Sequence, residues 1–326
     1  MFIAEAPPSL DWLPVIYYCD LINTENILHL PCTTLLSHQC LLGESPVWDA
    51  VEERIYWVDI ARHEIHSCKG NGKDHRVINT GESIGAVALH SKAKLLAALQ
   101  HGFACIDLND GSKEWIGSLV EEVIANRFND GKCDPSGRFW AGTMNLHGAK
   151  NAGSLYAMET DGTVRVKLKG VSVPNGMAWS PDGRYFYFID TATREVAAFD
   201  FDPVSGDICN QRTVVQIPPD MGKPDGMTID TEGMLWVALW DGWSISRWDP
   251  FTGALLCRIM LPVSRITSCT FGGKDLRDIY VTSSSLGLTD IQKKEQPLAG
   301  SVFVLRETPC QGLPAIPFGC RVKKFV

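Results

Sequence analysis

The segment NGMAWSPDGRYFYFIDT, residues 175–191, carries the local pattern that decides the fold. An apolar run at 177–179 precedes a turn that contains Pro181 and Gly183, and an aromatic run at 185–189 follows it. Proline fixes the backbone of one turn residue, and glycine supplies the positive φ that many tight hairpins require. The segment therefore predicts two short antiparallel strands joined by a tight turn.

Related segments occur five more times along the chain. They are GESPVWDAVEERIYWVDI (43–60), IGAVALHSKAKLLAALQ (84–100), NDGKCDPSGRFWAGTM (129–144), DGMTIDTEGMLWVALW (225–240) and SCTFGGKDLRDIYVTS (268–283). The steps between equivalent points are 41, 46, 45, 50 and 43 residues, counted over Glu44, Gly85, Gly131, Gly176, Gly226 and Cys269. This period is close to the roughly 40–50 residues of a four-stranded propeller blade.

Weaker strand pairs follow several of these hairpins, as in 195–208, and helical periodicity is nearly absent. Six such units without a flexible linker predict an all-β protein, a single six-bladed β-propeller with a central channel over residues 27–326. A solenoid or a sandwich is the alternative. We expect residues 301–306 to pair with a strand in 33–42 and so close the ring. Residues 1–26 then form an N-terminal extension of unknown role.

Composition limits the class of protein. The chain has 326 residues and a mass of 36.0 kDa, with 45% hydrophobic and 21% charged residues. These values are typical of a globular protein and exclude disorder as the main state. The formal net charge is −8, and no run of basic residues indicates a nucleic-acid partner. No apolar stretch approaches the roughly 20 residues of a membrane-spanning helix, so we expect cations or small neutral molecules as partners.

The N-terminus and the cysteines indicate the cellular compartment of the protein. Residues 1–20 contain Glu5 and Asp11 and no basic region, unlike a secretory signal. The 11 cysteines are odd in number and include no CxxC pair, whereas a disulfide scaffold or a zinc knuckle has closer and more regular spacing. We therefore expect reduced thiols in a cytoplasmic protein. The sequence leaves the oligomeric state open.

Polar side chains stand at the start of the predicted innermost strand in several repeats, where burial without a partner is costly. They are Glu44, Asn129, Asp130, Asn175 and Asp225. An Asn or Asp before Gly is an ordinary turn former, but recurrence at one point of the repeat, together with Glu44, favours a functional ring at one mouth of the channel. Converging carboxylate and amide oxygens are the ligands of a hard divalent cation, and positions would remain open for water and substrate.

Several long motifs carry a family resemblance. GESPVWD, NRFNDGKCDPSGRFWAGTM, PNGMAWSPDGRYFYFID, KPDGMTIDTEGMLWVALW and TSCTFGGKDLRDIYVTS resemble the senescence marker protein (regucalcin), gluconolactonase and luciferin-regenerating enzyme family, over residues 43–284. The resemblance implies a six-bladed propeller that holds one divalent cation. Calcium or zinc is the expected ion, and manganese and magnesium are the alternatives. It implies three metal ligands, namely Glu44, Asn175 and Asp225. It also implies substrate contacts by Arg127 and Asn129.

One position departs from the family pattern. The regucalcin branch has a glutamate three residues after the GTM segment, where it contacts the hydroxyl groups of a sugar lactone, and this chain has His147 there. Histidine can still hydrogen-bond a hydroxyl group, so His147 is a weaker candidate for substrate binding. The alternative is an exposed loop residue.

Two functions from different classes follow. The first is a divalent-metal-dependent hydrolase of a sugar lactone or related ester, in which the cation polarises the carbonyl and lowers the pKa of a bound water. Asp225 would act as the general base. The second is a calcium-binding regulatory protein of the regucalcin type, whose metal has no catalytic use. A purely structural interaction propeller would not need carboxylates at the channel mouth.

Other residues have structural interpretations. Cys133 lies in a predicted inner strand and is expected to be a small core residue. His63 and His66 follow the first hairpin and are expected to be exposed loop histidines. Four tryptophans on strand positions are expected to pack between blades, namely Trp57, Trp140, Trp179 and Trp236.

Overall fold

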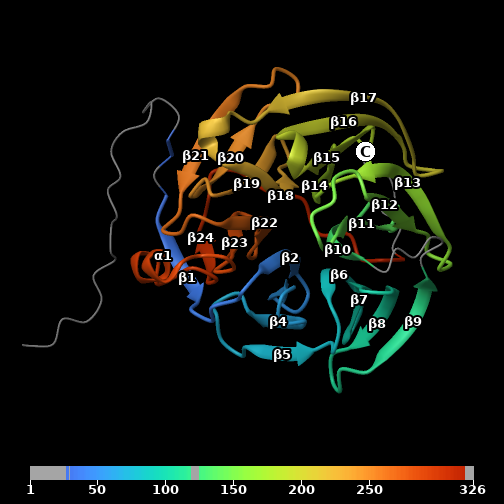
Figure 1. Ribbon diagram of the computed structural model, residues 1–326, viewed down its shortest axis with the longest axis horizontal. Coiled ribbons are helices and arrows are strands. Elements are labelled where there is room, and N and C mark those ends of the chain that lie inside the picture. Colours follow the sequence, from blue (N-terminus) through green and yellow to red (C-terminus); the bar gives the residue numbers. More distant parts are fainter. Residues whose placement is uncertain (1–26, 29, 119–124, 320–326) are drawn as a thin grey trace, which may run out of the picture.

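The computed structural model describes residues 27–28, 30–118 and 125–319. Within these ranges the chain forms six four-stranded antiparallel sheets around a central axis, as Figure 1 shows. The prediction of an all-β, six-bladed propeller is therefore confirmed. The predicted N-terminal extension, residues 1–26, lies outside the described residues.

Blades 1 to 5 each take four consecutive strands, counted from the channel outward (Figure 1). Blade 1 consists of β2 (Gly43–Asp49), β3 (Arg54–Asp59), β4 (Glu64–Lys69) and β5 (Arg76–Asn79). Blade 2 consists of β6 (Ile84–Ser91), β7 (Lys94–Leu99), β8 (Gly102–Asp107) and β9 (Lys113–Ser118). Blade 3 consists of β10 (Asn126–Cys133), β11 (Phe139–Asn145), β12 (Gly153–Met158) and β13 (Val164–Val171).

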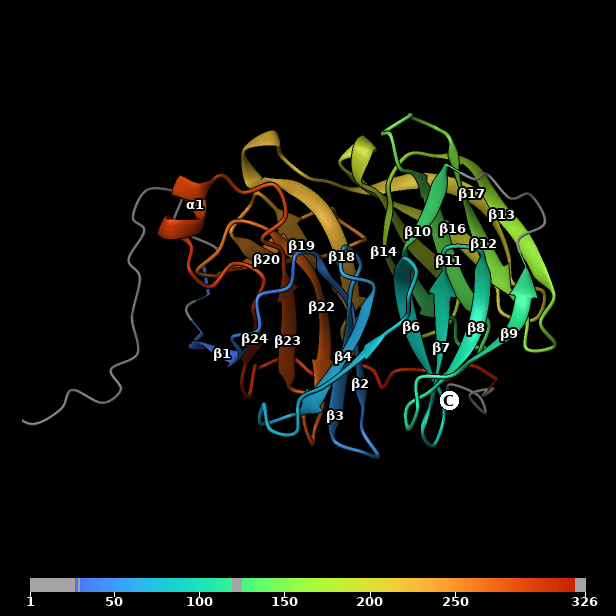
Figure 2. The same ribbon diagram turned by 60° about the horizontal axis from the view of Figure 1, so that its bottom comes forward.

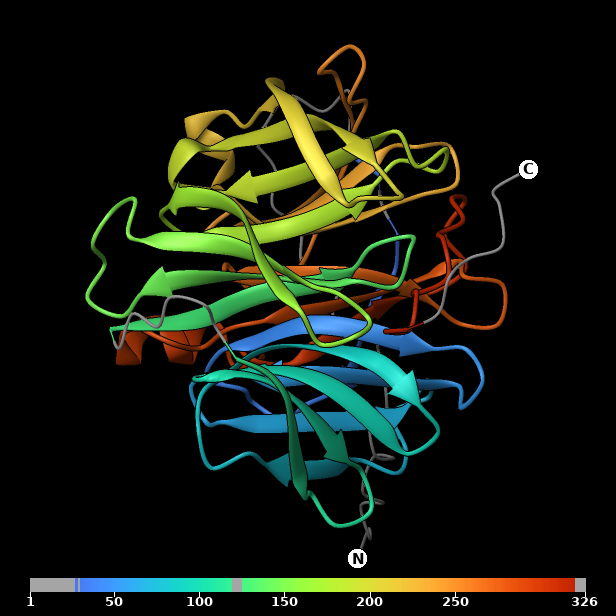
Figure 3. The ribbon, with the colours of Figure 1, turned by 90° about the vertical axis from the view of Figure 1, so that its right-hand side faces the viewer.

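Blade 4 consists of β14 (Pro174–Trp179), β15 (Tyr185–Asp190), β16 (Glu195–Asp202) and β17 (Asp207–Gln216). Blade 5 consists of β18 (Lys223–Ile229), β19 (Leu235–Trp240), β20 (Ser244–Trp248) and β21 (Leu255–Met260). Blade 6 consists of β22 (Ile266–Gly272), β23 (Asp278–Ser283), β24 (Val302–Leu305) and β1 (Cys32–Leu36). Figures 2 and 3 show from the side how the strands of each twisted blade run between the two faces of the ring.

The ring closes through blade 6, where β1, the first described strand, forms a sheet with the last three strands, β22, β23 and β24. β1 pairs antiparallel with β24, and Cys32 lies opposite Leu305. The predicted closure is thus confirmed, although the strand ends at Leu36 and a loop covers 37–42. Because this pairing uses the free edge of β24, the sheet of blade 6 becomes as wide as the other five.

Helices are short in the described part of the chain. They are the 3₁₀ turns η2 (Thr191–Thr193) and η3 (Pro219–Met221) and the helix α1 (Asp290–Glu295). α1 begins with a capping box, in which the side chain of Thr289 accepts from the backbone of Gln292. None of the described helices has the length and apolar character that a membrane-spanning segment needs.

Aromatic residues pack where neighbouring blades meet. Trp140 of blade 3 meets Trp179 of blade 4 edge to face, with ring centroids 5.7 Å apart. Trp236 of blade 5 meets Phe271 of blade 6 in the same way at 5.8 Å. These contacts confirm the predicted role of these three tryptophans, since edge-to-face aromatic pairs stabilise apolar interfaces. Trp57 also lies at a boundary between blades, in an apolar cluster with Val302 and Val304 of blade 6, and it stacks on His66 of its own blade.

The innermost strand of every blade has a register irregularity at the same place. It falls at Glu44/Val47, Ile84/Ala86, Phe128/Asp130, Asn175/Met177, Pro224/Met227 and Ile266/Ser268. A β-bulge re-aims a side chain and often lies beside an active site. In this register Asn175 is the equivalent of Glu44, whereas Asn129 and Asp225 lie one residue later, inside the irregularity.

Candidate functional site

The structure brings the predicted polar residues together at the bulges around the channel. Glu44 of β2, Asn175 of β14 and Asp225 of β18 are only 3%, 3% and 5% exposed. Asn129 and Asp130 of β10 are also buried. The innermost strands of neighbouring blades contact one another around the ring. Four blades therefore contribute buried oxygen-bearing side chains to one region.

Blade 2 contributes no such side chain. Its bulge falls at Gly85, where a Cβ atom would lie 2.5 Å from the backbone carbon of Phe128 in β10. Glycine is therefore required for the close approach of β6 to β10. On the side of blade 2, backbone packing therefore replaces a polar side chain.

Asn175 is held in one orientation by hydrogen bonds. Its Nδ2 donates to Oγ1 of Thr191 at 2.7 Å, and that hydroxyl donates to the carbonyl oxygen of Pro224 at 2.8 Å. Its Oδ1 accepts from Nδ2 of Asn129 at 3.1 Å. Because Nδ2 is committed to Thr191, the oxygen of Asn175 faces the ring and keeps a lone pair for a cation. Sequence reasoning missed Thr191, which lies in η2 and acts only through this contact.

Asn129 is a connector within the ring. Its Oδ1 accepts from Nη1 of Arg127 at 2.9 Å, and its Nδ2 also donates to the carbonyl oxygen of Pro174 at 2.8 Å. Arg127 therefore reaches the ring through Asn129. Burial lowers the pKa of Arg127 to about 10, against the opposing effect of Glu44, so its guanidinium stays charged at neutral pH.

Two carboxyl groups of the ring have strongly raised pKa values. Burial, and then the nearby carboxylates of Asp225 and Asp130, raise the pKa of Glu44 well above its ordinary value. Burial and Asp130 do the same for the pKa of Asp225. The three carboxylates therefore repel one another in a desolvated space. A divalent cation among them would offset both effects.

One oxygen atom of Asp225 is the clearest indication that the ring can bind a cation. Oδ1 of Asp225 is buried and has no hydrogen-bond partner among the described residues. A buried carboxylate oxygen without a partner is destabilising, and hard divalent cations bind such oxygens. The donor set of Glu44, Asn175 and Asp225 consists of oxygen atoms only, which fits this chemistry.

Asp130 has different partners from the other two carboxylates. Its Oδ1 accepts from Oγ of Ser45 at 3.3 Å and from the backbone N–H of Gly131 at 2.7 Å. Lys132 acts on it electrostatically, and Nζ of Lys132 donates to the carbonyl oxygen of Met227 in blade 5 at 2.6 Å. Burial lowers the pKa of Lys132, and Asp130 opposes that effect. Sequence reasoning missed Lys132, although a lysine two residues after Asp130 on a strand shares its face.

His147 lies apart from the buried ring. It is exposed in the turn after β11, where its backbone N–H donates to Oδ1 of Asn145 at 3.0 Å. Its contact with a substrate stays a prediction.

The sequence predictions for Cys133 and His66 have different outcomes. Cys133 is buried in an apolar cluster with Phe103 and Phe139, as expected of a core residue. The interpretation of His66 as an exposed loop residue is wrong, because this side chain is fully buried on β4. The strand begins at Glu64, before His66, and the side chain of His66 points into the core. His63 remains in the turn before β4, at a positive φ of 61°.

Comparison with known proteins agrees with this architecture. The family model for the SMP-30/Gluconolactonase/LRE-like region matches residues 42–285. The chain is 39% identical over 281 residues to YvrE, a provisionally named sugar lactone lactonase of Bacillus subtilis (strain 168), which covers 86% of this chain and 96% of YvrE. It is 37% identical over 291 residues to regucalcin of Sus scrofa, covering 87% of this chain and 97% of the relative.

A solved structure extends the likeness to three dimensions. Regucalcin of Agrobacterium tumefaciens, described as a calcium-binding protein, superposes with a TM-score of 0.86 at 27% identity, over 90% of this chain and 99% of the other. The family-model match, residues 42–285, contains all six innermost strands and their bulges.

Proposed function

Because the chain belongs to the SMP-30/gluconolactonase/LRE-like family, we propose that it is a divalent-metal-dependent hydrolase of a sugar lactone or a related ester. The observation that carries the proposal is the unpartnered Oδ1 of Asp225 within a buried ring of oxygen donors. The similarity to a protein named as a sugar lactone lactonase supports the choice of substrate class.

The cation would be held by Glu44, Asn175 and Asp225. Asn175 is oriented for this role by Thr191, and the carboxylates supply two negative charges. Asp130 is engaged with Ser45 and Gly131, so it acts on the site through its charge. Oxygen donors suit calcium, and zinc also accepts carboxylate ligands. When bound, the cation would polarise the lactone carbonyl and make a water molecule more acidic.

Asp225 would act as the general base. In that role a carboxylate oxygen of Asp225 would take a proton from the attacking water as the water oxygen bonds to the carbonyl carbon. The ring C–O bond then breaks, and the same proton passes to the departing alkoxide, which gives a hydroxy acid. Arg127, which stays charged at neutral pH, would stabilise the negative charge that develops on the carbonyl oxygen. Asn129 would hold Arg127 and contact the substrate, and His147 is kept as a weaker contact.

A second candidate is a calcium-binding protein without catalysis. The similarity to the regucalcin of Agrobacterium tumefaciens, a calcium-binding protein, favours it. The two candidates share the metal ligands and differ in what Asp225 and Arg127 do.

One experiment separates them. Hydrolysis of an aldonic δ-lactone is followed by acid release, before chelation, after chelation and after return of calcium, zinc, manganese or magnesium. We expect activity to disappear with the metal and to return with at least one ion. Activity that survives complete metal removal contradicts the proposed hydrolase, and metal binding with no turnover of any lactone favours the second candidate.

A further inference from the structure

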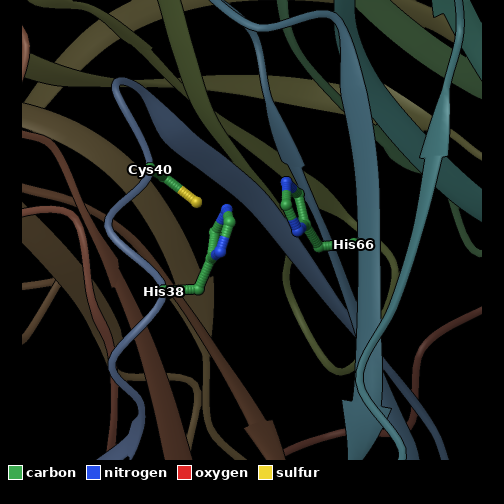
Figure 4. Close-up of side chains that lie close together, drawn as sticks. All are labelled: His38, Cys40 and His66. Carbon is green, nitrogen blue, oxygen red and sulfur yellow. The ribbon is translucent and has the colours of Figure 1, made fainter.

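A second cluster of potential metal ligands lies at the seam where the ring closes. His38 and Cys40 belong to the loop 37–42, which leads from β1 in blade 6 to β2 in blade 1, and His66 lies on β4. One ligand atom from each residue lies within 4.8 Å of the others. Figure 4 shows the sulfur of Cys40 and the rings of His38 and His66 directed toward a common space.

Two nitrogen atoms of this seam cluster are hydrogen-bonded to each other, at a distance close to that between two ligands of one metal ion. Nδ1 of His66 lies 3.1 Å from Nε2 of His75. Two nitrogens bound to one tetrahedral zinc ion, each about 2.0–2.1 Å from it, lie about 3.3 Å apart. His75 can therefore supply a fourth donor with a small shift.

Glu64 sets the protonation of His66. Nε2 of His66 lies 3.1 Å from Oε2 of Glu64, so this nitrogen carries the proton and donates it to the carboxylate. The lone pair of Nδ1 accepts from Nε2–H of His75, so a metal ion would replace this hydrogen bond once His75 carries its proton on Nδ1. A carboxylate that holds the second nitrogen of a histidine is the usual support of a metal-bound imidazole.

Burial keeps His66 neutral, and one buried atom of His38 has no partner among the described residues. Burial, followed by the charges of His38, His75 and Arg62, lowers the pKa of His66 to about 3. Nε2 of His38 is buried and has no hydrogen-bond partner among the described residues. Neutral imidazoles with free lone pairs are metal donors.

The residues around the cluster hold it in place. Trp57 stacks on His66 and His75 at centroid distances of 5.3 and 5.9 Å. The backbone N–H of Cys40 donates to the carbonyl oxygen of Gly300 at 2.9 Å, and the carbonyl of Cys40 accepts from Oγ of Ser285 at 2.8 Å. The donors are thus positioned before any ion binds.

Asp59 is close but committed elsewhere. Its two oxygens accept from the backbone N–H groups of Leu41 and Leu42 at 2.8 and 3.1 Å, and it also accepts from Arg62. These bonds fix the loop rather than offer a ligand.

We propose that His38, Cys40 and His66, with His75 as the fourth donor, form a zinc site that fastens the seam of the propeller. Thiolate and imidazole donors select zinc over calcium, in contrast to the oxygen donors of the channel. Binding releases the thiol proton of Cys40 to solvent as the sulfur–zinc bond forms. Four protein donors leave no open position, so the ion is structural.

The test uses the full chain with Glu44→Gln and Asp225→Asn, so that the channel ligands do not contribute. Zinc binding is measured by equilibrium dialysis, and cobalt(II) is added as a spectroscopic probe. We expect one tightly bound zinc ion and a thiolate-to-cobalt charge-transfer band. Both should be lost in Cys40→Ser and in His66→Asn.

Matched controls are available on the same chain. Cys209→Ser removes an exposed thiol, and His63→Asn changes a neighbouring histidine at a positive φ that asparagine tolerates. Both should retain the band. His38→Gln changes a half-buried loop side chain and serves if a buried variant fails to fold; it should weaken zinc binding at least tenfold. Absence of the charge-transfer band in the parent chain, or unchanged zinc binding in all ligand variants, overturns the proposal.

Discussion

The channel ring and the seam cluster are two groups of potential ligands built in different ways. The ring takes oxygen donors from equivalent bulges of different blades, at Glu44, Asn175 and Asp225. The seam cluster takes nitrogen and sulfur donors from one loop and from blade 1. The comparison shows that the sequence repeat places similar side chains at the same point of several blades. The closure of the ring, in contrast, brings together residues that have no equivalent in the other blades.

The chemistry of the two groups differs accordingly. The ring holds acidic groups that burial and mutual repulsion make hard to ionise. At the seam, burial lowers the pKa values of His66 and His75 and so favours neutral imidazoles. Hard cations should therefore prefer the ring, and zinc should prefer the seam. The predictions below test whether the two groups are independent.

The largest effect is expected for Asp225→Asn. The substitution keeps the size of the side chain but removes the proposed general base, so kcat/KM for lactone hydrolysis should fall about 10²- to 10⁴-fold. Zinc binding at the seam should not change. Asp220→Asn, at an exposed position of η3, is the control and should keep full activity. Activity of Asp225→Asn within twofold of the parent would remove Asp225 from the catalytic role.

Glu44→Gln should weaken the binding of the channel cation by about 100-fold or more, because a direct ligand matters at least as much as its supporting residues. The propeller should survive, since blade packing is untouched and a repelling charge is removed. Calorimetric titration measures the affinity, and excess cation should restore part of the activity. Unchanged affinity would assign Glu44 a structural role.

Thr191→Val tests the support of Asn175. The valine cannot accept from Nδ2 of Asn175, so the amide loses its fixed orientation and cation affinity should fall about tenfold. Thr193→Val, in the same 3₁₀ turn, is the matched control, because its hydroxyl donates to the carbonyl of Asp190 and accepts from the backbone N–H of Glu195, both outside the ring. Equal affinities of the two variants would contradict the positioning role.

The smallest effect concerns the pH dependence of the metal-free protein. The pKa values of Glu44 and Asp225 are raised in the folded state, so the folded chain binds more protons than the unfolded chain above their ordinary values of 4.5 and 3.8. The free energy of unfolding should therefore decrease as the pH rises from that range through the folded pKa values. Urea unfolding at several pH values measures it, and Glu44→Gln should flatten the curve. A curve of the same slope in that variant would mean that other groups dominate.

The sequence predicted the fold because the hairpin pattern repeats with a regular period. It also placed Glu44, Asn129, Asn175 and Asp225 on one ring, since the repeat register alone decides which positions meet. Their roles stay predictions. Thr191 was missed because it acts through a contact that only the folded ring creates. Lys132 was missed although it lies two residues after Asp130, on the same face of the strand.

The seam cluster shows the limit of spacing as a signal. His38, Cys40 and His66 do not form a metal-binding motif along the chain, and their proximity depends on the closure of blade 6. The error over His66 had a local cause, since its strand begins at Glu64. A buried histidine cannot be told from an exposed one when the boundary of a short strand is uncertain by two residues.

The closure of the ring also orders events in time. The hydroxyl of Thr33 bonds to the carbonyl oxygen of Val304, 271 residues away. At a synthesis rate of about 5–20 residues per second, β1 leaves the ribosome roughly 15–50 seconds before its partner strand exists. During that interval five blades can form in sequence while the first strand waits. The nascent chain therefore cannot close the ring until β24 is synthesised, so closure is a late step of folding.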